Sequence, residues 1–78
     1  MEIIYILTKV DASHAETLLG SISKVEGVTF VHAVTGSYDM LISMEGPNLA
    51  KLLSKALKEI SGLEGIKSTE TLIAINLD

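Results

Sequence analysis

The sequence predicts an α+β domain in which strands and helices follow one another in the order βαββαβ. Four stretches are rich in β-branched and aromatic residues, and two stretches between them have apolar residues at helical spacing. In addition, Ile22–Val28 and Ile60–Ile66 have similar sequences, ISKVEGV and ISGLEGI, each between a predicted helix and a predicted strand. A segment repeated in this way indicates two similar halves of one domain.

The first stretch, residues 2–10, predicts a strand because it combines isoleucine, tyrosine and other residues that favour extended structure. Alternation along a strand places Ile4 and Ile6 on one face and Tyr5 and Leu7 on the other. Since both faces are apolar, we expect this strand to be covered on both sides.

Residues 13–24 predict the first helix, which would start at a capping box formed by Ser13 and Glu16. Residues 28–35 predict the second strand. Gly36-Ser37 follows it directly and suits a two-residue hairpin turn, because glycine tolerates the positive φ that such turns require.

The second half repeats this alternation. Residues 38–45 predict the third strand, and Gly46-Pro47-Asn48 ends that strand and starts a helix. From Leu49 to Ile60 the apolar residues fall on one helical face, with Gly62 as the expected cap at the C-terminal end. Residues 65–77 predict the last strand.

This order of elements predicts a ferredoxin-like βαββαβ sandwich, with residues 1–78 as one domain. Its four-stranded antiparallel sheet would carry both helices on one face. The other face would be bare in a monomer, and its apolar residues favour two sheets packed face to face, as in dimeric α/β barrels. The alternative is a monomer whose bare face is partly polar.

Composition and charge argue against several classes of function. The chain has a net charge of −4, six lysines and no arginine, which speaks against direct binding of nucleic acid. It has no cysteine and two well-separated histidines, so we expect neither a disulfide nor a metal site. No apolar run approaches the roughly 18 residues of a membrane span, and the first residues do not show the basic-then-apolar pattern of a signal peptide. We therefore expect a cytoplasmic protein without a membrane partner.

Two segments are candidates for a binding site. In the predicted hairpin Val34–Asp39, exposed backbone amides near Gly36 could hold a carboxylate and Asp39 could hold an ammonium group, a combination that suits an amino acid. A tight turn in which Asp39 caps the backbone explains the same residues. Thr69 and Thr71 could offer hydroxyls to a polar ligand from one face of the last strand, or could be ordinary strand residues.

These segments together resemble the effector-binding (RAM) domain of the Lrp/AsnC, or feast/famine, transcription regulators. The resemblance covers the whole chain and rests on Gly27-Val28, the Gly-x-Tyr-Asp turn, Leu63–Ile66 and the Thr-x-Thr strand. It implies an amino acid or similar small effector as ligand, no cofactor, and dimers that assemble into larger rings such as octamers. By position, the ligand-binding residues would be Gly36, Ser37, Tyr38, Asp39, Thr69 and Thr71.

The sequence departs from that family in one respect, because the usual N-terminal helix-turn-helix is missing and Met1 begins directly on the first strand. We therefore expect a non-enzymatic module, with no catalytic residues, that regulates transcription or metabolism indirectly, for example by assembling with full-length relatives. Three alternatives stay open: a module that serves assembly alone, an enzyme of the dimeric α+β barrel type with His32 or Asp39 as its base, and an ACT-type module with its ligand loop at Asp11–His14.

Overall fold

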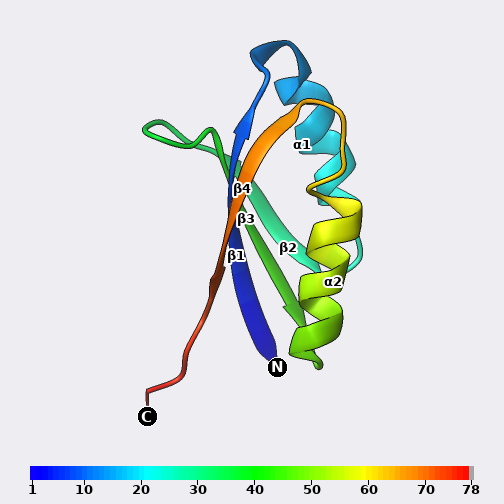
Figure 1. Ribbon diagram of the computed structural model, residues 1–78, viewed down its shortest axis with the longest axis vertical. Helices are drawn as coiled ribbons and strands as arrows, with labels where there is room; N and C mark the ends of the chain where they lie inside the picture. Colours follow the sequence, from blue (N-terminus) through cyan, green and yellow to red (C-terminus); the bar gives the residue numbers. More distant parts are fainter. Residues whose placement is uncertain (78) are drawn as a thin grey trace.

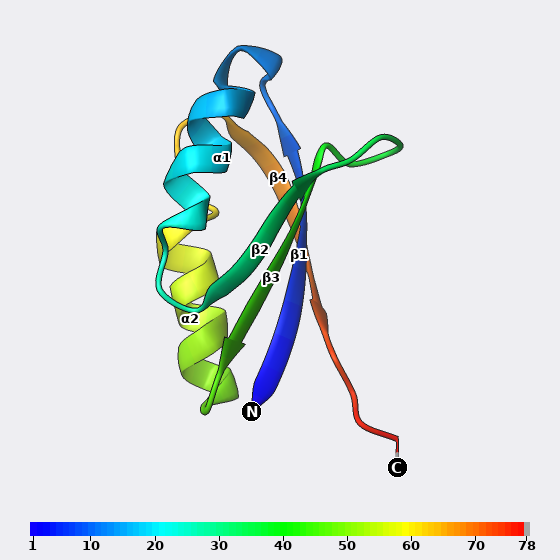
Figure 2. The same ribbon diagram turned by 180° about the vertical axis from the view of Figure 1, so that it is seen from behind.

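A computed structural model describes residues 1–77 and shows one four-stranded sheet with two helices packed against one of its faces (Figures 1 and 2). The elements are β1 Glu2–Val10, the short 3-10 helix η1 Ala12–His14, α1 Ala15–Ser23, β2 Val28–Ala33, β3 Met40–Gly46, α2 Leu49–Glu59 and β4 Ile66–Ile73. The strands lie in the order β2-β3-β1-β4, and each neighbouring pair is antiparallel. The predicted ferredoxin-like fold is therefore confirmed.

The core lies between the sheet and the helices and takes every second residue of the central strands. Ile4 and Ile6 of β1 pair with Met44 and Ile42 of β3, and all four side chains are almost completely buried. The helices and the turn after α2 add Leu18, Ile22, Leu52, Ala56 and Ile60 to the same cluster. Burial of a large apolar side chain stabilises the fold by about 1.5–3 kcal/mol, so this layer fixes where both helices sit.

The opposite face of the sheet, called the open face below, carries no helix (Figure 2). Strand register places Tyr5 and Leu7 of β1 on it, beside Phe30, Leu41 and Leu72 of the other three strands. The prediction that β1 is apolar on both faces is thus confirmed, although the chain itself covers only one of them. A contiguous apolar face of this kind is typical of an interaction surface.

The repeated segment forms the same turn twice. Gly27 and Gly65 precede β2 and β4 with nearly the same positive φ, 96° and 98°. The Gly27 carbonyl accepts a hydrogen bond from the Glu45 amide, and the Gly65 carbonyl accepts one from the Asp11 amide, both at 2.8 Å. Each half therefore enters its second strand through a turn that glycine adopts without strain.

The helix ends differ from the sequence prediction. The Ser13–Glu16 capping box was wrong, because Asp11 competes for the same donors: the amide and the hydroxyl of Ser13 both donate to Asp11 Oδ1 and start η1 instead. Gly62 is not a left-handed cap, since its φ is not positive. The chain instead leaves α2 at Ile60, whose amide still bonds to a helical carbonyl.

Two strand boundaries also differ. Ala33 pairs with Met40, so the loop between β2 and β3 spans residues 34–39 and the two-residue hairpin was wrong. The loop is longer because its last residue is hydrogen-bonded to β1. The last strand ends at Ile73 rather than 77, because its partner there is Ile4 and β1 itself begins two residues earlier.

Candidate functional site

The 34–39 hairpin projects from the end of the sheet on the side away from the helices (Figures 1 and 2). It is closed by a hydrogen bond from the Val34 amide to the Asp39 carbonyl, at 2.9 Å. Gly36 has a φ of 116°, and no atom outside its chain neighbours lies within 4 Å of the position that a Cβ would take there. The backbone amides of residues 35–38 donate no hydrogen bond within the described chain. The tip therefore presents free donors in an open position.

Asp39 fixes this hairpin to the sheet. Its amide donates to the Thr8 carbonyl at 2.8 Å, and its Oδ2 accepts from the Val10 amide at 2.9 Å. The pairing of β1 with β4 shifts register between Lys9 and Val10. At this irregularity the Asp39 carboxylate serves as the acceptor for the Val10 amide. Asp39 thus does accept from a backbone amide, but that amide belongs to β1 and not to the turn that the sequence suggested, while Oδ1 has no partner among residues 1–77.

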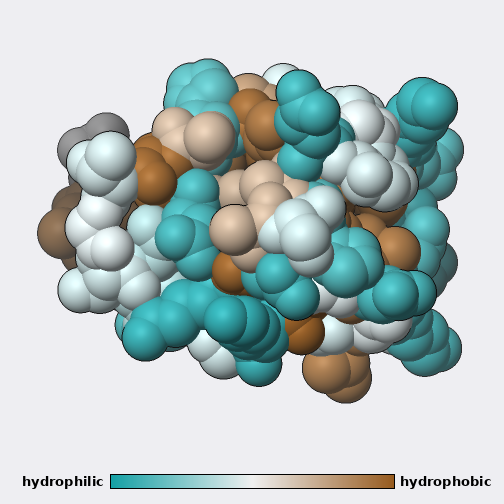
Figure 3. All heavy atoms as spheres, turned by 90° about the horizontal axis from the view of Figure 1, so that it is seen from above, coloured by the Kyte–Doolittle hydropathy of each residue, from teal (hydrophilic) through white to brown (hydrophobic). Residues whose placement is uncertain are grey.

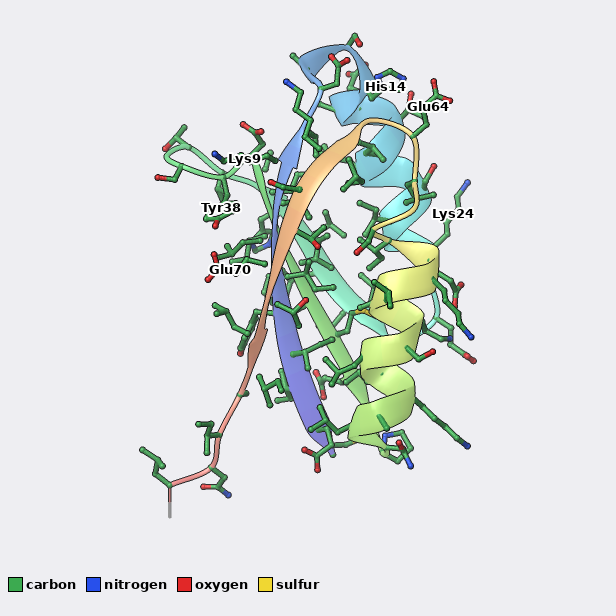
Figure 4. All side chains as sticks on the ribbon, viewed as in Figure 1. Lys9, His14, Lys24, Tyr38, Glu64 and Glu70 are labelled. Carbon is green, nitrogen blue, oxygen red and sulfur yellow. The ribbon has the colours of Figure 1, made fainter. Side chains whose placement is uncertain are left out.

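Tyr38 lies across the open face toward β4 (Figure 4). Its hydroxyl donates to Glu70 Oε1, and Lys9 Nζ lies 5.9 Å from the centre of its ring. The hydrogen bond to Glu70 raises the pKa of the Tyr38 phenol, with smaller contributions from desolvation and from the Glu70 charge. A cation, two carboxylates and a phenol therefore surround the base of the hairpin.

Lys9 and Glu70 did not emerge from the sequence as site residues. A signal for them exists in the alternation of the strands, because Lys9 follows Tyr5 and Leu7 at period two and Glu70 lies between the two threonines. That pattern assigns a face to each residue. Their closeness to Tyr38 depends in addition on the β1–β4 register, which the sequence does not specify.

Thr69 and Thr71 lie on the other side of the sheet. They pair with Thr8 and Ile6 of β1, whose side chains are buried beneath the helices. The Thr69 hydroxyl shares a hydrogen bond of 3.3 Å with Ser61 Oγ after α2, and Thr71 is exposed at the edge of the sheet. The chain thus brings four of the six predicted residues together in the hairpin and places the two threonines on the helix side.

The buried hydroxyl of Thr8 has no hydrogen-bond partner in the described part of the chain. Thr8 lies between Met40 and Thr69 in the sheet, and its side chain is inaccessible to solvent. An unpaired buried hydroxyl costs stability, and here it sits directly beside the threonine that the sequence marked as a ligand contact.

The two histidines lie in different surroundings. His14 Nε2 is 3.3 Å from Glu64 Oε1, beside Asp11, whose carboxyl pKa is lowered by the two hydrogen bonds from Ser13 (Figure 4). His32 is exposed on β2, and its ring stacks on the ring of Phe30, with 4.4 Å between the two ring centres. Among residues 1–77, no group of three histidine or acidic side chains is placed to hold a metal ion.

Two further properties concern the surface. No helix among residues 1–77 is long and apolar enough to cross a membrane. Figure 3 views the end of the molecule that carries the hairpin, and there hydrophobic and hydrophilic side chains are interspersed. This end therefore offers polar groups to a ligand next to apolar surface.

Residues 3–77 match the family described as the Lrp/AsnC ligand binding domain. The chain belongs to the Lrp/AsnC family. Among curated relatives, the HTH-type transcriptional regulator LysM of Sulfurisphaera tokodaii is 36% identical over 56 residues, which cover 72% of this chain and 39% of LysM. LysM of Saccharolobus solfataricus is matched over 37% of its length. This Lrp/AsnC chain therefore corresponds to less than half the length of each of these two relatives.

Several solved structures share its fold. The protein TTHA0845 from Thermus thermophilus is 28% identical, with a TM-score of 0.91 over 97% of this chain and 95% of that one. Transcriptional regulator NMB0573 from Neisseria meningitidis was solved as a complex with L-Met; it is 15% identical, with a TM-score of 0.86 over 97% of this chain and 51% of that one. The family match and the two LysM regulators, rather than these structures, identify a regulatory, effector-binding type of domain.

Proposed function

We propose that this chain senses a free amino acid at its 34–39 hairpin and associates with further copies of itself through the open face. The observation that carries the proposal is the arrangement of free groups at the hairpin. The amides of residues 35–38 are unpaired within residues 1–77, and Asp39 Oδ1 is unpaired beside them. Amides suit a carboxylate and a carboxylate suits an ammonium group, so the hairpin complements both charged ends of an amino acid.

Binding by more than one copy is part of this proposal. Thr69 and Thr71 lie on the helix side of β4, while the hairpin projects on the open side. A ligand that contacts both groups, as the family resemblance implies, would have to lie between the hairpin of one copy and β4 of another. The L-Met complex of the Neisseria meningitidis relative supports an amino acid as the class of ligand.

Self-association is supported by the open face. Tyr5, Leu7, Phe30, Leu41 and Leu72 gather on it, half-buried or exposed, and no helix packs over them. A second sheet laid against this one would remove these side chains from water, in the way that two packed sheets share a core. We propose a dimer formed in this manner as the unit from which a larger ring, such as an octamer, is built.

We infer a non-enzymatic, regulatory role, in keeping with the transcriptional regulators among the relatives. The net charge of −4 and the lack of arginine speak against DNA contact by these residues themselves. Regulation would then pass through other chains, such as longer relatives in a mixed assembly. His32, one of the two candidate bases of the alternative enzyme, is exposed and has no acidic hydrogen-bond partner among residues 1–77.

The ligand is tested by thermal melting against each of the twenty amino acids at fixed protein concentration. A ligand at 100 times its Kd stabilises the folded state by about 2.7 kcal/mol, which shifts the Tm of a small domain by several degrees. Asp39→Asn is the informative variant, because its amide oxygen can still accept from Val10 while the charge is gone. We expect this variant to melt near the wild type without ligand and to lose the ligand-dependent shift.

Asp11→Asn is the matched control, since it removes the same charge from the carboxylate that caps the N-terminal end of η1, outside the hairpin. It should keep the ligand-dependent shift. If no amino acid moves the Tm of the wild-type chain, the assembly-only alternative is the better one. If Asp39→Asn retains the full shift, Asp39 does not hold the ammonium group.

Self-association is tested by sedimentation velocity over a dilution series. Leu7→Glu places a charge at the centre of the open face and should give a monomer. Leu57→Glu is the control, because Leu57 is 69% exposed on α2, on the other side of the sheet. A wild-type chain that stays monomeric at every concentration would contradict the proposed assembly.

A further inference from the structure

The residues that follow β4 form an extended segment with apolar side chains in water. The Ala74 amide still donates to the Ile3 carbonyl at 3.0 Å, so the segment leaves the sheet from a fixed point beside β1. Beyond it, Ile75 and Leu77 are 78% and 91% exposed. Positions two apart in an extended chain face the same side, so the two side chains are spaced to enter one groove.

The segment also has a defined direction. Figures 1 and 2, taken from opposite sides, both show it turning away from the helices, on the same side as the 34–39 hairpin. The hairpin and the segment thus project from opposite ends of the open face. A body packed against the open face would lie between them.

We infer that residues 74–77 are an arm that packs against a second copy of this chain across the open face. The inference rests on the proposed self-association, and it adds a contact outside the two sheets. Three observations favour a second copy as the occupant: the arm is continuous with the open face, its side chains are apolar like that face, and its direction carries it past the sheet edge rather than back onto its own core.

Space for such a contact exists where the arm begins. A hollow of about 540 Å³ is bounded by the start of β1 and by the arm, with Ile3, Ala74 and Ile75 among its lining residues. Next to it on the open face lies Leu72, which is also exposed. In a symmetric pair, each copy would offer an arm and receive one. Each arm residue would therefore make its contact with the partner twice in the dimer, once from each copy.

The test is the variant Ile75→Ser/Leu77→Ser, compared with the wild type by sedimentation equilibrium. Each apolar side chain buried at an interface contributes about tenfold to affinity or more, so the two side chains of one arm account for about a hundredfold and the four of both arms for about ten-thousandfold in the dimer Kd. Leu57→Ser is the control, because it removes an apolar side chain that is 69% exposed on the helix side, and its monomer–dimer Kd should stay within about threefold of the wild type. Ile75→Leu/Leu77→Ile keeps the apolar surface and should keep the affinity.

A second measurement tests directly whether the arm is accessible to a protease. Carboxypeptidase should release the terminal residues quickly at concentrations where the wild-type chain is monomeric and much more slowly where it is dimeric. If the serine variant dimerises like the wild type, or if the release rate does not depend on protein concentration, the arm does not pack on a second copy. If the wild-type chain does not dimerise at all, the proposed self-association fails, and the arm inference with it, so the two failures are told apart.

Discussion

Gly27 and Gly65 occupy the same place in the two halves of the chain. Replacing each in turn with alanine and comparing the two losses in unfolding free energy distinguishes the cost of backbone strain from the cost of steric contact. Their φ values differ by only 2°, so a side chain would meet the same strain at both positions, about 1–2 kcal/mol. Their neighbours differ. A Cβ at Gly27 would lie 3.2 Å from the Glu45 carbonyl oxygen, whereas a Cβ at Gly65 would lie 2.5 Å from His14 Cβ and 2.7 Å from His14 Cγ.

The two variants should therefore differ in stability. A contact of 2.5 Å cannot be accommodated without moving η1, and forced overpacking of this kind costs about 1–3 kcal/mol in addition to the strain. We expect Gly27→Ala to lower the free energy of unfolding by about 1–2 kcal/mol and Gly65→Ala by about 2–5 kcal/mol. In a domain of this size each kcal/mol corresponds to a Tm change of about 4–8 °C.

The assay is thermal and urea unfolding at one protein concentration, because association alters the apparent stability. Gly20→Ala serves as control: Gly20 lies within α1 with no neighbour within 4 Å, so alanine there should stabilise by about 0.5–1 kcal/mol. His14→Gly removes the atoms that Gly65→Ala would strike. In a double-mutant cycle it should recover more than about 1 kcal/mol of the Gly65→Ala loss.

Equal destabilisation by the two alanine variants would refute the steric part of this reasoning. A cycle with no coupling between positions 14 and 65 would do the same. Near-wild-type stability of Gly27→Ala would refute the part that depends on φ.

Three further outcomes are expected. In a Tyr5→Phe background, Glu70→Gln should lower the pH at which the Tyr38 phenol ionises, as measured by tyrosinate absorbance. The pKa of Tyr38 is raised in the folded state, so its hydrogen bond to Glu70 stabilises the fold below the unfolded pKa, and this stabilisation is lost as the pH rises through the folded pKa. An unchanged titration would show that Glu70 does not cause the shift. Thr8→Val should raise the Tm, since it removes a buried hydroxyl without a partner in residues 1–77; a lower Tm would reveal an uncounted partner. Asn48→Ala should cost about 1 kcal/mol in urea unfolding, because the Asn48 side chain caps α2 by accepting from the Lys51 amide at 2.9 Å; no loss would mean that another acceptor replaces it.

Short-range patterns in the sequence were sufficient for the architecture. Alternation in β1 placed Ile4 and Ile6 on one face and Tyr5 and Leu7 on the other, and the structure puts the first pair in the core and the second pair on the open face. The repeat that contains Gly27 and Gly65 indicated two similar halves, and the structure shows the same turn in both. These features follow from local geometry, because the periods of strands and helices fix which residues share a face whatever lies beyond them.

The ends of the elements were less well predicted, since several residues compete for the same donors there. Ser13 and Asp11 both can start a helix, and only the folded chain shows that Asp11 accepts while Ser13 donates. The hairpin was predicted too short for a related reason. Asp39 is held by β1, 29 residues earlier at Val10, and no pattern within the hairpin reveals that bond.

The sequence by itself determined the order of the elements, the two faces of β1, the segment with Gly36 and Asp39, and the family to which these motifs point. Only the tertiary structure decided what surrounds that segment: Glu70 lies under the Tyr38 hydroxyl, 32 residues away, and Thr69 and Thr71 lie on the opposite side of the sheet. The physical reason is strand register. A shift of one residue between β1 and β4 would exchange the faces of all three β4 residues, and register is set by packing of the whole sheet rather than by any local spacing.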